Sequence, residues 1–184
     1  MFAASDFLTR EVWTGRGLVT HYLLFKISLA DRAVEILGVT TRPDEVWMLQ
    51  VGQNLIDSDA GALRDKRYLI IDRDTKYTQQ FQRLIEDAGT QVIRLLPMSP
   101  YSNAYAERFV RSIKQEYLNR LIFIGQASLR RAVSEFIAHY HCERNHQGLE
   151  NNLIRPCSGD ANDRPVRCRQ RLGGMLNFYH RMAA

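Results

Sequence analysis

Acidic residues near the ends of predicted strands and helices are the part of this sequence most able to do chemistry. The apolar run from Tyr68 to Ile71 ends in Asp72, and Glu107 follows with thirty-four residues between the two acids. A third acid, Asp6, lies within the first predicted strand. Carboxylates from different elements can hold divalent metal ions, which activate the attacking oxygen and stabilise the leaving oxygen in phosphoryl transfer. The three acids therefore indicate a metal site that acts on phosphate.

Each of these acids, taken alone, has a simpler explanation. A single Asp at the end of a strand is commonly a turn or helix-cap residue, and this applies most to Asp6. Asp74 closes the same strand as Asp72, so the residues alone leave these two as rival ligands. The interpretation as a metal site depends on the acids occurring together and in this order.

Glu107 begins a run of charged residues with helical spacing. Arg111 and Lys114 follow it by four and seven positions, which places all three on one face of a helix. A carboxylate for metal with two cations beside it would bring a nucleic-acid backbone close to the metal ions. The simpler alternative is a surface ion pair between Glu107 and Arg111, worth about 0.3–0.5 kcal/mol.

The elements that must position these acids begin with a segment of strands. Residues 2–13, 18–29 and 34–41 are rich in apolar and β-branched residues and are separated by short turns, which predicts an antiparallel meander. Helical periods then alternate with short apolar runs. The later predicted strands are 68–71 and 91–96, and the predicted helices are 43–57, 78–88, 102–121 and 128–141. This order predicts an α/β fold with a mixed central sheet and helices on both faces.

Charge is unevenly distributed along a chain whose net charge is +5. Residues 1–93 carry 11 Lys and Arg against 13 Asp and Glu, whereas residues 94–184 carry 14 against 7. An acidic half that could hold cations is thus followed by a basic half that could bind a polyanion, although charge alone favours a role in solubility. We divide the chain into a core of residues 1–156 and a basic C-terminal tail of residues 157–184, with a short helix expected near its end.

Composition disfavours several classes of protein. No apolar run reaches the roughly 20 residues of a membrane span, and the first residues do not form a signal peptide. The three cysteines, Cys142, Cys157 and Cys168, form no C-x-x-C pair, which fits a reducing cytoplasm. A zinc site of His139, Cys142 and His146 is an alternative, but their spacing matches no standard zinc finger. We therefore expect a cytoplasmic protein without a membrane anchor.

Three motifs, taken in order, resemble one known family. They are Asp72-Arg73-Asp74-Thr75-Lys76-Tyr77-Thr78, then Pro100-Tyr101-Ser102-Asn103-Ala104-Tyr105-Ala106-Glu107 with Lys114, and then Tyr140-His141-Cys142-Glu143-Arg144-Asn145-His146-Gln147-Gly148-Leu149 with Pro156. Over about residues 3–156 the chain resembles the catalytic core of retroviral integrases and bacterial insertion-sequence DDE transposases. His141 and Asn145 replace the Asn and Pro that the closing motif of the bacterial group usually carries.

The resemblance implies a ribonuclease H-like fold with a mixed five-stranded sheet, in agreement with the predicted order of elements. It assigns both catalysis and metal binding to Asp6, Asp72 and Glu107, with a pair of Mg²⁺ or Mn²⁺ ions as cofactor. The family usually carries Gly where Asp74 stands, which favours Asp72 as the ligand. The candidate DNA-binding residues are Asn103, Arg108, Arg111, Lys114, Arg144 and His146.

The activity that the resemblance implies is DNA integration or transposition. A metal-activated water would cut at the 3′ end of an element, and the freed 3′-hydroxyl would attack target DNA, without a covalent enzyme intermediate. DNA is then the partner, and the joining of two DNA ends favours a homodimer or a larger homo-oligomer. We expect the loop from Pro97 to Ser102 to become ordered when DNA binds.

Two other functions remain open from the sequence. No helix-turn-helix segment precedes Asp6, so the chain could be a truncated or non-catalytic remnant that binds DNA or supports assembly. It could also be a ribonuclease H-like nuclease that cuts without strand transfer. The presence of all three carboxylates favours catalysis, and the basic tail and the closing motif favour a transposase over a nuclease.

Overall fold

The computed structural model describes residues 1–59, 61–95, 103–156 and 166–181. The loop from Pro97 to Ser102 and the first part of the predicted tail lie outside the described residues. The chain divides into two compact units, Met1–Gln126 and Ala127–Ala184, which we describe one at a time.

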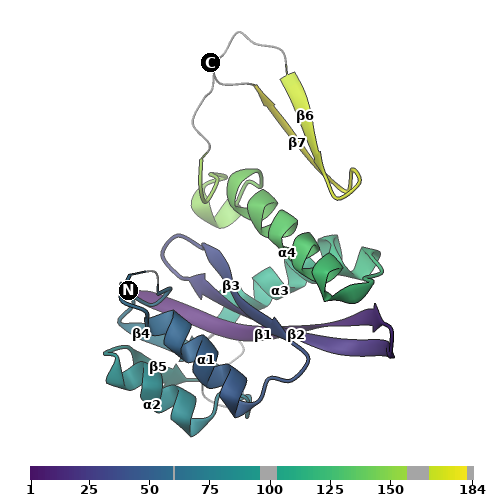
Figure 1. The fold of residues 1–184 in the computed structure, drawn as a ribbon. Helices are drawn as coiled ribbons and strands as arrows, with labels where there is room; N and C mark the ends of the chain where they lie inside the picture. Colours follow the sequence, from purple (N-terminus) through teal and green to yellow (C-terminus); the bar gives the residue numbers. More distant parts are fainter. Residues whose placement is uncertain (60, 96–102, 157–165, 182–184) are drawn as a thin grey trace. The chain divides into compact units, whose positions relative to one another are not determined.

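A mixed five-stranded sheet forms the centre of the first unit (Figure 1). In the order β3-β2-β1-β4-β5, its strands are β1 (Phe2–Thr14), β2 (Gly17–Ser28), β3 (Val34–Thr40), β4 (Tyr68–Ile71) and β5 (Gln91–Arg94). The first three strands are antiparallel, whereas β4 runs parallel to both β1 and β5. The predicted meander and the predicted mixed sheet are both confirmed.

Helices cover both faces of this sheet (Figure 1). On one face, α1 (Glu45–Ile56) and α2 (Gln79–Asp87) share a hydrophobic cluster with β1, β2 and β4. On the other face, α3 (Ala104–Glu116) packs Phe109 against Phe25 of β2, with ring centroids 4.9 Å apart. Within the described part of the chain, no helix is long and apolar enough to cross a membrane.

Local signals account for most helix boundaries, although some details differ from the prediction. Asp44 caps α1 by accepting a hydrogen bond from the Trp47 N–H at 3.1 Å, as its place before an apolar run suggests. The helix buries Met48 and leaves Val46 79% exposed. The predicted helix 102–121 is shorter, because α3 ends at Glu116 and a 3₁₀ turn, η2 (Leu118–Arg120), follows.

The second unit combines a helix with a β-hairpin. Its elements are α4 (Gly125–Cys142), of which all but the first two residues belong to this unit, η3 (Gln147–Leu149), β6 (Val166–Arg171) and β7 (Leu176–Arg181). The prediction of a short helix in the basic tail is therefore wrong, because the described part of the tail forms two strands. The residues of β6 alternate between Arg and smaller or neutral side chains, which suits a strand. Leu172, Gly173 and Gly174 take positive φ angles of 58°, 69° and 87° and form the turn.

A buried carboxylate ties this hairpin to the end of α4. The Glu143 side chain is 1% exposed and accepts hydrogen bonds from Arg171 Nε at 2.9 Å and Arg171 Nη2 at 2.7 Å. Arg169 Nη1 and the ring nitrogen Nδ1 of His139 also donate to it, at 3.3 and 3.0 Å. Burial raises the pKa of Glu143, but hydrogen bonds from Arg171 and His139 outweigh it and lower the pKa from 4.5 to about 2. Two arginines of the predicted basic tail are thus engaged by protein carboxylate.

We expect Glu143→Gln to lower the free energy of unfolding at pH 7 by about 3 kcal/mol, because it removes one member of a buried ion pair. The pKa of Glu143 is lower in the folded protein than its ordinary value. Its contribution to stability is therefore complete above about pH 4.5 and is lost as the pH falls toward 2. Urea unfolding of both proteins across this pH range measures the difference.

The exposed residue Glu150 supplies the matched control, and Glu150→Gln should leave stability nearly unchanged. A difference between the native protein and Glu143→Gln that stays constant from pH 7 to pH 2 would contradict this account of the hairpin.

Candidate functional site

The register of the sheet brings Asp6 and Asp72 together. Ser5 of β1 pairs with Ile71 of β4 in the parallel ladder, so the next residue on each strand is an aspartate. Ile71 belongs to the cluster beneath α1 and α2. Because side chains alternate along a strand, Asp6 and Asp72 point to the opposite face.

Glu107 approaches the same face from α3. Asp6 stands opposite Phe25 in the β1–β2 ladder, and Phe25 contacts Phe109 of α3. Glu107 precedes Phe109 by two positions, so it lies on the exposed side of a helix whose other side is buried. Three segments far apart in the sequence therefore bring the three predicted carboxylates to the carboxyl end of β4, beside the middle of β1.

The pKa of Asp6 reflects its burial and the nearby acids. Burial raises the pKa of Asp6 from 3.8 to about 6, and repulsion from Asp72, Glu107 and Asp74 adds to the increase. A hydrogen bond from the Phe7 N–H to Asp6 Oδ1, at 2.7 Å, acts in the opposite direction. Asp6 therefore points toward the other acids and not into the core.

Asp72 is held by the turn that follows β4. Its Oδ1 accepts a hydrogen bond from the Asp74 N–H at 3.0 Å. Burial raises the pKa of Asp72, and that hydrogen bond lowers it, as do the charges of Lys76 and Arg94. Asp74 raises the same pKa by repulsion, so this acid lies within the electrostatic reach of both Asp6 and Asp72.

The donor set fits a divalent cation in its chemistry. Carboxylate oxygens are the ligands that Mg²⁺ and Mn²⁺ prefer, and a cation would relieve the repulsion that Asp6 experiences. However, no group of three or more His, Cys, Asp or Glu among the described residues is arranged to hold a metal ion. The carboxylates lie near one another, but the described residues do not surround a single position for an ion.

The predicted DNA-binding residues of α3 differ in accessibility. Arg108 and Arg111 are exposed and Lys114 is half-buried, so all three present positive charge at the surface of the helix. Asn103, at the start of α3, is 6% exposed. Its Oδ1 is buried and has no hydrogen-bond partner within the described ranges. Little of Asn103 is left for direct contact with DNA.

Arg144 and His146 belong to the second unit, where both pack around Tyr140. The His146 Nε2 donates to the Tyr140 carbonyl at 2.8 Å, and the Arg144 guanidinium carbon lies 5.6 Å from the centre of the Tyr140 ring. His139 is bonded to Glu143. Since the described residues offer no cluster for a metal ion, the zinc alternative gains no support.

Two residues near the acids were not identified as part of the site from the sequence. Tyr77 is buried and donates to Ser5 Oγ at 3.1 Å, and Lys76 Nζ lies 2.5 Å from Asp74 Oδ2. The alternation Asp72-x-Asp74-x-Lys76 is a signal for successive turns and could have drawn attention to Lys76. Nothing local identifies Tyr77, whose partner lies 72 positions away.

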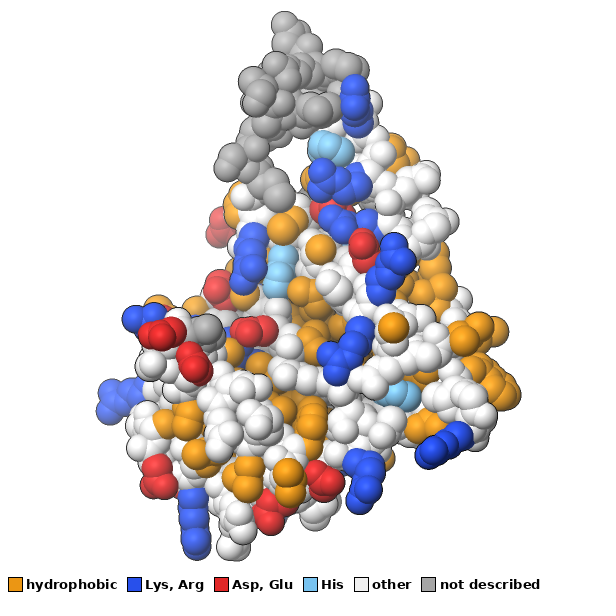
Figure 2. Space-filling model, viewed as in Figure 1, with side chains coloured by type: hydrophobic (Ala, Val, Ile, Leu, Met, Phe, Trp, Pro, Cys, Tyr) orange, Lys and Arg blue, Asp and Glu red, His pale blue; other side chains and the backbone are white. Residues whose placement is uncertain are grey.

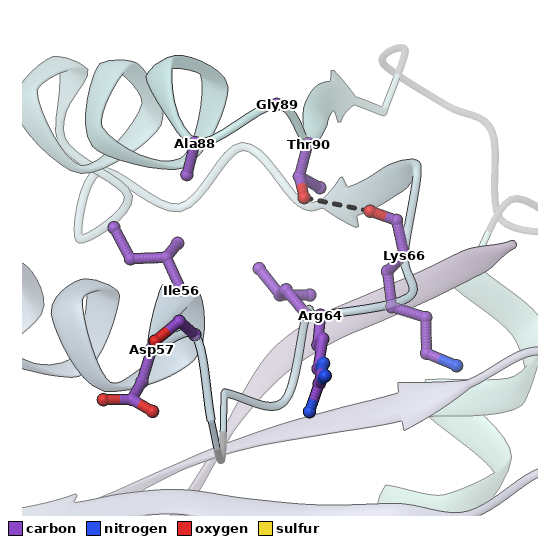
Figure 3. Close-up of a pocket in the computed structure, with 9 residues that line it drawn as sticks. Ile56, Asp57, Arg64, Lys66, Ala88, Gly89 and Thr90 are labelled. Carbon is purple, nitrogen blue, oxygen red and sulfur yellow. Dashed lines mark hydrogen bonds between the residues drawn. The ribbon is translucent and has the colours of Figure 1, made fainter.

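Two hollows of the first unit lie apart from the acids. A cavity of about 240 Å³ is bordered by Arg64, Lys66 and Thr90, and Thr90 Oγ1 donates to the Lys66 carbonyl at 2.9 Å (Figure 3). Because Lys66 and Thr90 precede β4 and β5, this cavity lies at the end of the sheet opposite to Asp72. It is not part of the candidate metal site.

The second hollow lies beside the turn that joins β1 to β2 and is lined mainly by apolar side chains. Hydrophobic side chains gather in this region in Figure 2. Trp13 is 53% exposed, and Ile122 and Ile124 are 79% and 77% exposed. A surface of this kind is typical of contacts with another macromolecule and not of phosphoryl transfer.

Comparison with known proteins agrees with these observations. Residues 88–152 match the family described as integrase core domain. The transposase for insertion sequence element IS904 of Lactococcus lactis subsp. lactis (strain IL1403) is 28% identical over 81 residues. That match covers 43% of this chain and 32% of the transposase, so it spans about a third of the relative's length. The family match includes Glu107 but neither Asp6 nor Asp72.

Solved structures share the fold. The magnesium complex of the HTLV-2 integrase catalytic core domain, in its trimeric form, aligns with a TM-score of 0.59 at 11% identity, over 83% of this chain and 92% of that one. The catalytic core domain of BIV integrase aligns with a TM-score of 0.52 at 16% identity, over 80% and 87%. The ribonuclease H-like fold is confirmed. The family and transposase matches, each over less than half of this chain, are to the same group of proteins that the motifs resemble.

In the metal-free protein we expect Asp6 to titrate near pH 6, because burial and neighbouring acids raise its pKa from 3.8. Because the pKa is higher in the folded protein, protonation of Asp6 stabilises the folded state. This contribution to stability is complete below about pH 3.8 and is lost as the pH rises through 6. Asp72→Asn should reverse only part of the increase in the pKa of Asp6, because it removes one neighbouring charge but leaves Asp6 buried. Carboxyl chemical shifts followed by NMR across this range measure it.

Asp59→Asn, an exposed change elsewhere in the first unit, should leave the titration of Asp6 unchanged. If Asp6 titrated near 4, or if Asp72→Asn had no more effect than Asp59→Asn, the grouping of the carboxylates would be contradicted.

Proposed function

We propose that this chain is the catalytic core of a DDE transposase or integrase that cuts DNA at 3′ ends and joins them to target DNA. Asp6, Asp72 and Glu107 are the proposed catalytic residues and the ligands of a pair of Mg²⁺ or Mn²⁺ ions. The observation that carries the proposal is the register that pairs Ser5 with Ile71, which places Asp6 beside Asp72 on the sheet face against which the helix of Glu107 packs. Residues that serve only as turn or cap residues would have no reason to meet in this way.

The roles of the three acids follow from how each is held. The Phe7 N–H fixes one oxygen of Asp6, and the Asp74 N–H fixes one oxygen of Asp72, so each leaves its other oxygen for a ligand. Glu107 is exposed in the first turn of α3 and can swing toward the two aspartates. Divalent ions, when bound, would activate the attacking oxygen and stabilise the leaving oxygen, so no nucleophilic side chain is required.

DNA is the proposed substrate and partner. The helix that carries Glu107 also carries positive charge on Arg108, Arg111 and Lys114. These charges could bind the phosphate backbone of DNA and so place it near the acids. Contacts of this kind position DNA without reading its sequence. They support binding along the face of α3.

The proposed assembly is a homodimer or a larger homo-oligomer. Cutting and joining two DNA ends in one event calls for more than one set of catalytic acids. The HTLV-2 integrase core has been solved in trimeric and dimeric forms. The exposed apolar residues Trp13, Ile122 and Ile124 are compatible with contacts between copies.

An assay of DNA cleavage and strand transfer tests the catalytic assignment. With Mg²⁺ or Mn²⁺ present, we expect Asp72→Asn and Glu107→Gln each to reduce both reactions by roughly a hundredfold or more, because each removes a charged ligand. Glu86→Gln, an exposed change on α2, is the matched control and should retain activity. Metal-dependent activity that survives both substitutions would rule out these ligands. Cleavage without any joined product would favour the nuclease instead.

The salt dependence of DNA binding tests the role of α3. Arg111→Ala and Lys114→Ala should each reduce the slope of log affinity against log salt concentration by about 0.9, because each removes one phosphate contact. Fluorescence anisotropy with labelled duplex DNA at several salt concentrations measures the slope. Arg83→Ala removes an equal charge from α2, on the other face of the sheet, and should leave the slope unchanged. Equal slopes for all three variants would contradict binding along α3.

A further inference from the structure

A fourth carboxylate, Asp74, stands beside the three proposed metal ligands. It repels both Asp6 and Asp72, so it lies within the electrostatic reach of the same site. Its Oδ1 accepts a hydrogen bond from the Lys76 N–H at 3.0 Å, and its own N–H donates to Asp72. Residues 72–76 therefore form two successive side-chain turns that hold Asp74 next to Asp72.

Lys76 occupies the remaining oxygen of this acid. Its Nζ lies 2.5 Å from Asp74 Oδ2, and the two side chains are only 24% and 23% exposed. Both carboxylate oxygens of Asp74 are thus bonded to Lys76, one through the backbone N–H and one through the ammonium group. Water therefore has limited access to the pair.

The sheet, and not only the turn, sets the position of Lys76. Its ammonium group lies 5.2 Å from the centre of the Phe7 ring and 5.3 Å from that of Tyr22, which are cation–π distances. Phe7 packs against the cluster beneath α1 and α2, so it is on the face of the sheet opposite to Asp6. Tyr22 pairs with Thr9, two positions from Phe7, and shares that face. The ammonium group that bonds Asp74 is therefore held beside rings on the face of the sheet opposite to Asp6.

We propose that Lys76 is a positioning residue that occupies both oxygens of Asp74, so that this fourth carboxylate does not bind the metal ions of Asp6, Asp72 and Glu107. The inference rests on the proposed function, since it requires a metal site to protect. It explains how the chain accommodates an extra acid two residues after a metal ligand. Without Lys76, Asp74 would add an unbalanced negative charge and a free ligand beside the site.

Direct measurement of Mn²⁺ binding by electron paramagnetic resonance tests this proposal in a double-mutant cycle. Lys76→Met keeps the apolar stem and removes the charge. We expect it to tighten Mn²⁺ binding by about tenfold when Asp74 is present, because a free carboxylate is added to the site. In the Asp74→Asn background, the same change should have less than about a threefold effect, since the charge of Lys76 is lost but no carboxylate is freed.

Three further variants make the cycle interpretable. Lys66→Met removes a lysine that bonds Ser28 at the other end of β4, and it should leave Mn²⁺ affinity unchanged. Lys76→Arg keeps the positive charge, so this variant should bind Mn²⁺ as the native chain does. Lys76→Gln repeats the test if Lys76→Met fails to fold, as judged by circular dichroism.

The outcomes separate this inference from the proposed function. Equal effects of Lys76→Met in the two backgrounds, or weaker Mn²⁺ binding in the native background, would overturn the role of Lys76 alone, provided that Asp72→Asn abolishes binding. A native chain that binds no Mn²⁺, or binding that persists in Asp72→Asn, would overturn the metal site and the role of Lys76 with it.

Discussion

The parallel pairing of β1 with β4, which places Asp6 beside Asp72, is the constraint on which the proposed site depends. Asp6 meets the charges of Asp72, Glu107 and Asp74 in a half-buried place where water screens them poorly. Like charges brought together in this way oppose folding, so the surrounding structure must hold them by other means. The hydrogen bonds from Phe7 and Asp74, and the charges of Lys76 and Arg94, are the local means.

The sheet supplies the remaining stabilisation. Beneath the acids, the buried Tyr77 hydroxyl donates to Ser5, and the Ser5 hydroxyl donates to the Phe25 carbonyl at 2.9 Å. These bonds join the turn after β4 to β1 and β2, so the positions of Asp6 and Asp72 are linked through the core. On the other face, the contact between Phe25 and Phe109 anchors the helix that carries Glu107. The site is therefore a product of register and packing more than of any loop.

Much of the fold could be predicted because its signals are local. The strand from Tyr68 to Ile71 has the predicted bounds, since it is a short apolar run closed by acids. The grouping of Asp6 with Asp72 follows from alternation once the two strands are known to be parallel neighbours, which no local pattern reveals. The β6–β7 hairpin could not be found in the same way. Most of its residues are exposed, so it has no hydrophobic period, and its anchor is the distant residue Glu143.

The described residues group the proposed metal ligands without closing them around an ion, so a bound ion must be located directly. Crystals soaked in Mn²⁺ and measured near the manganese absorption edge would locate bound ions by anomalous scattering. The account predicts a peak in contact with the carboxylates of both Asp6 and Asp72, with Glu107 turned toward it and Asp74 still paired with Lys76. Manganese bound only elsewhere, or no peak beside Asp6 and Asp72 at saturating Mn²⁺, would contradict it.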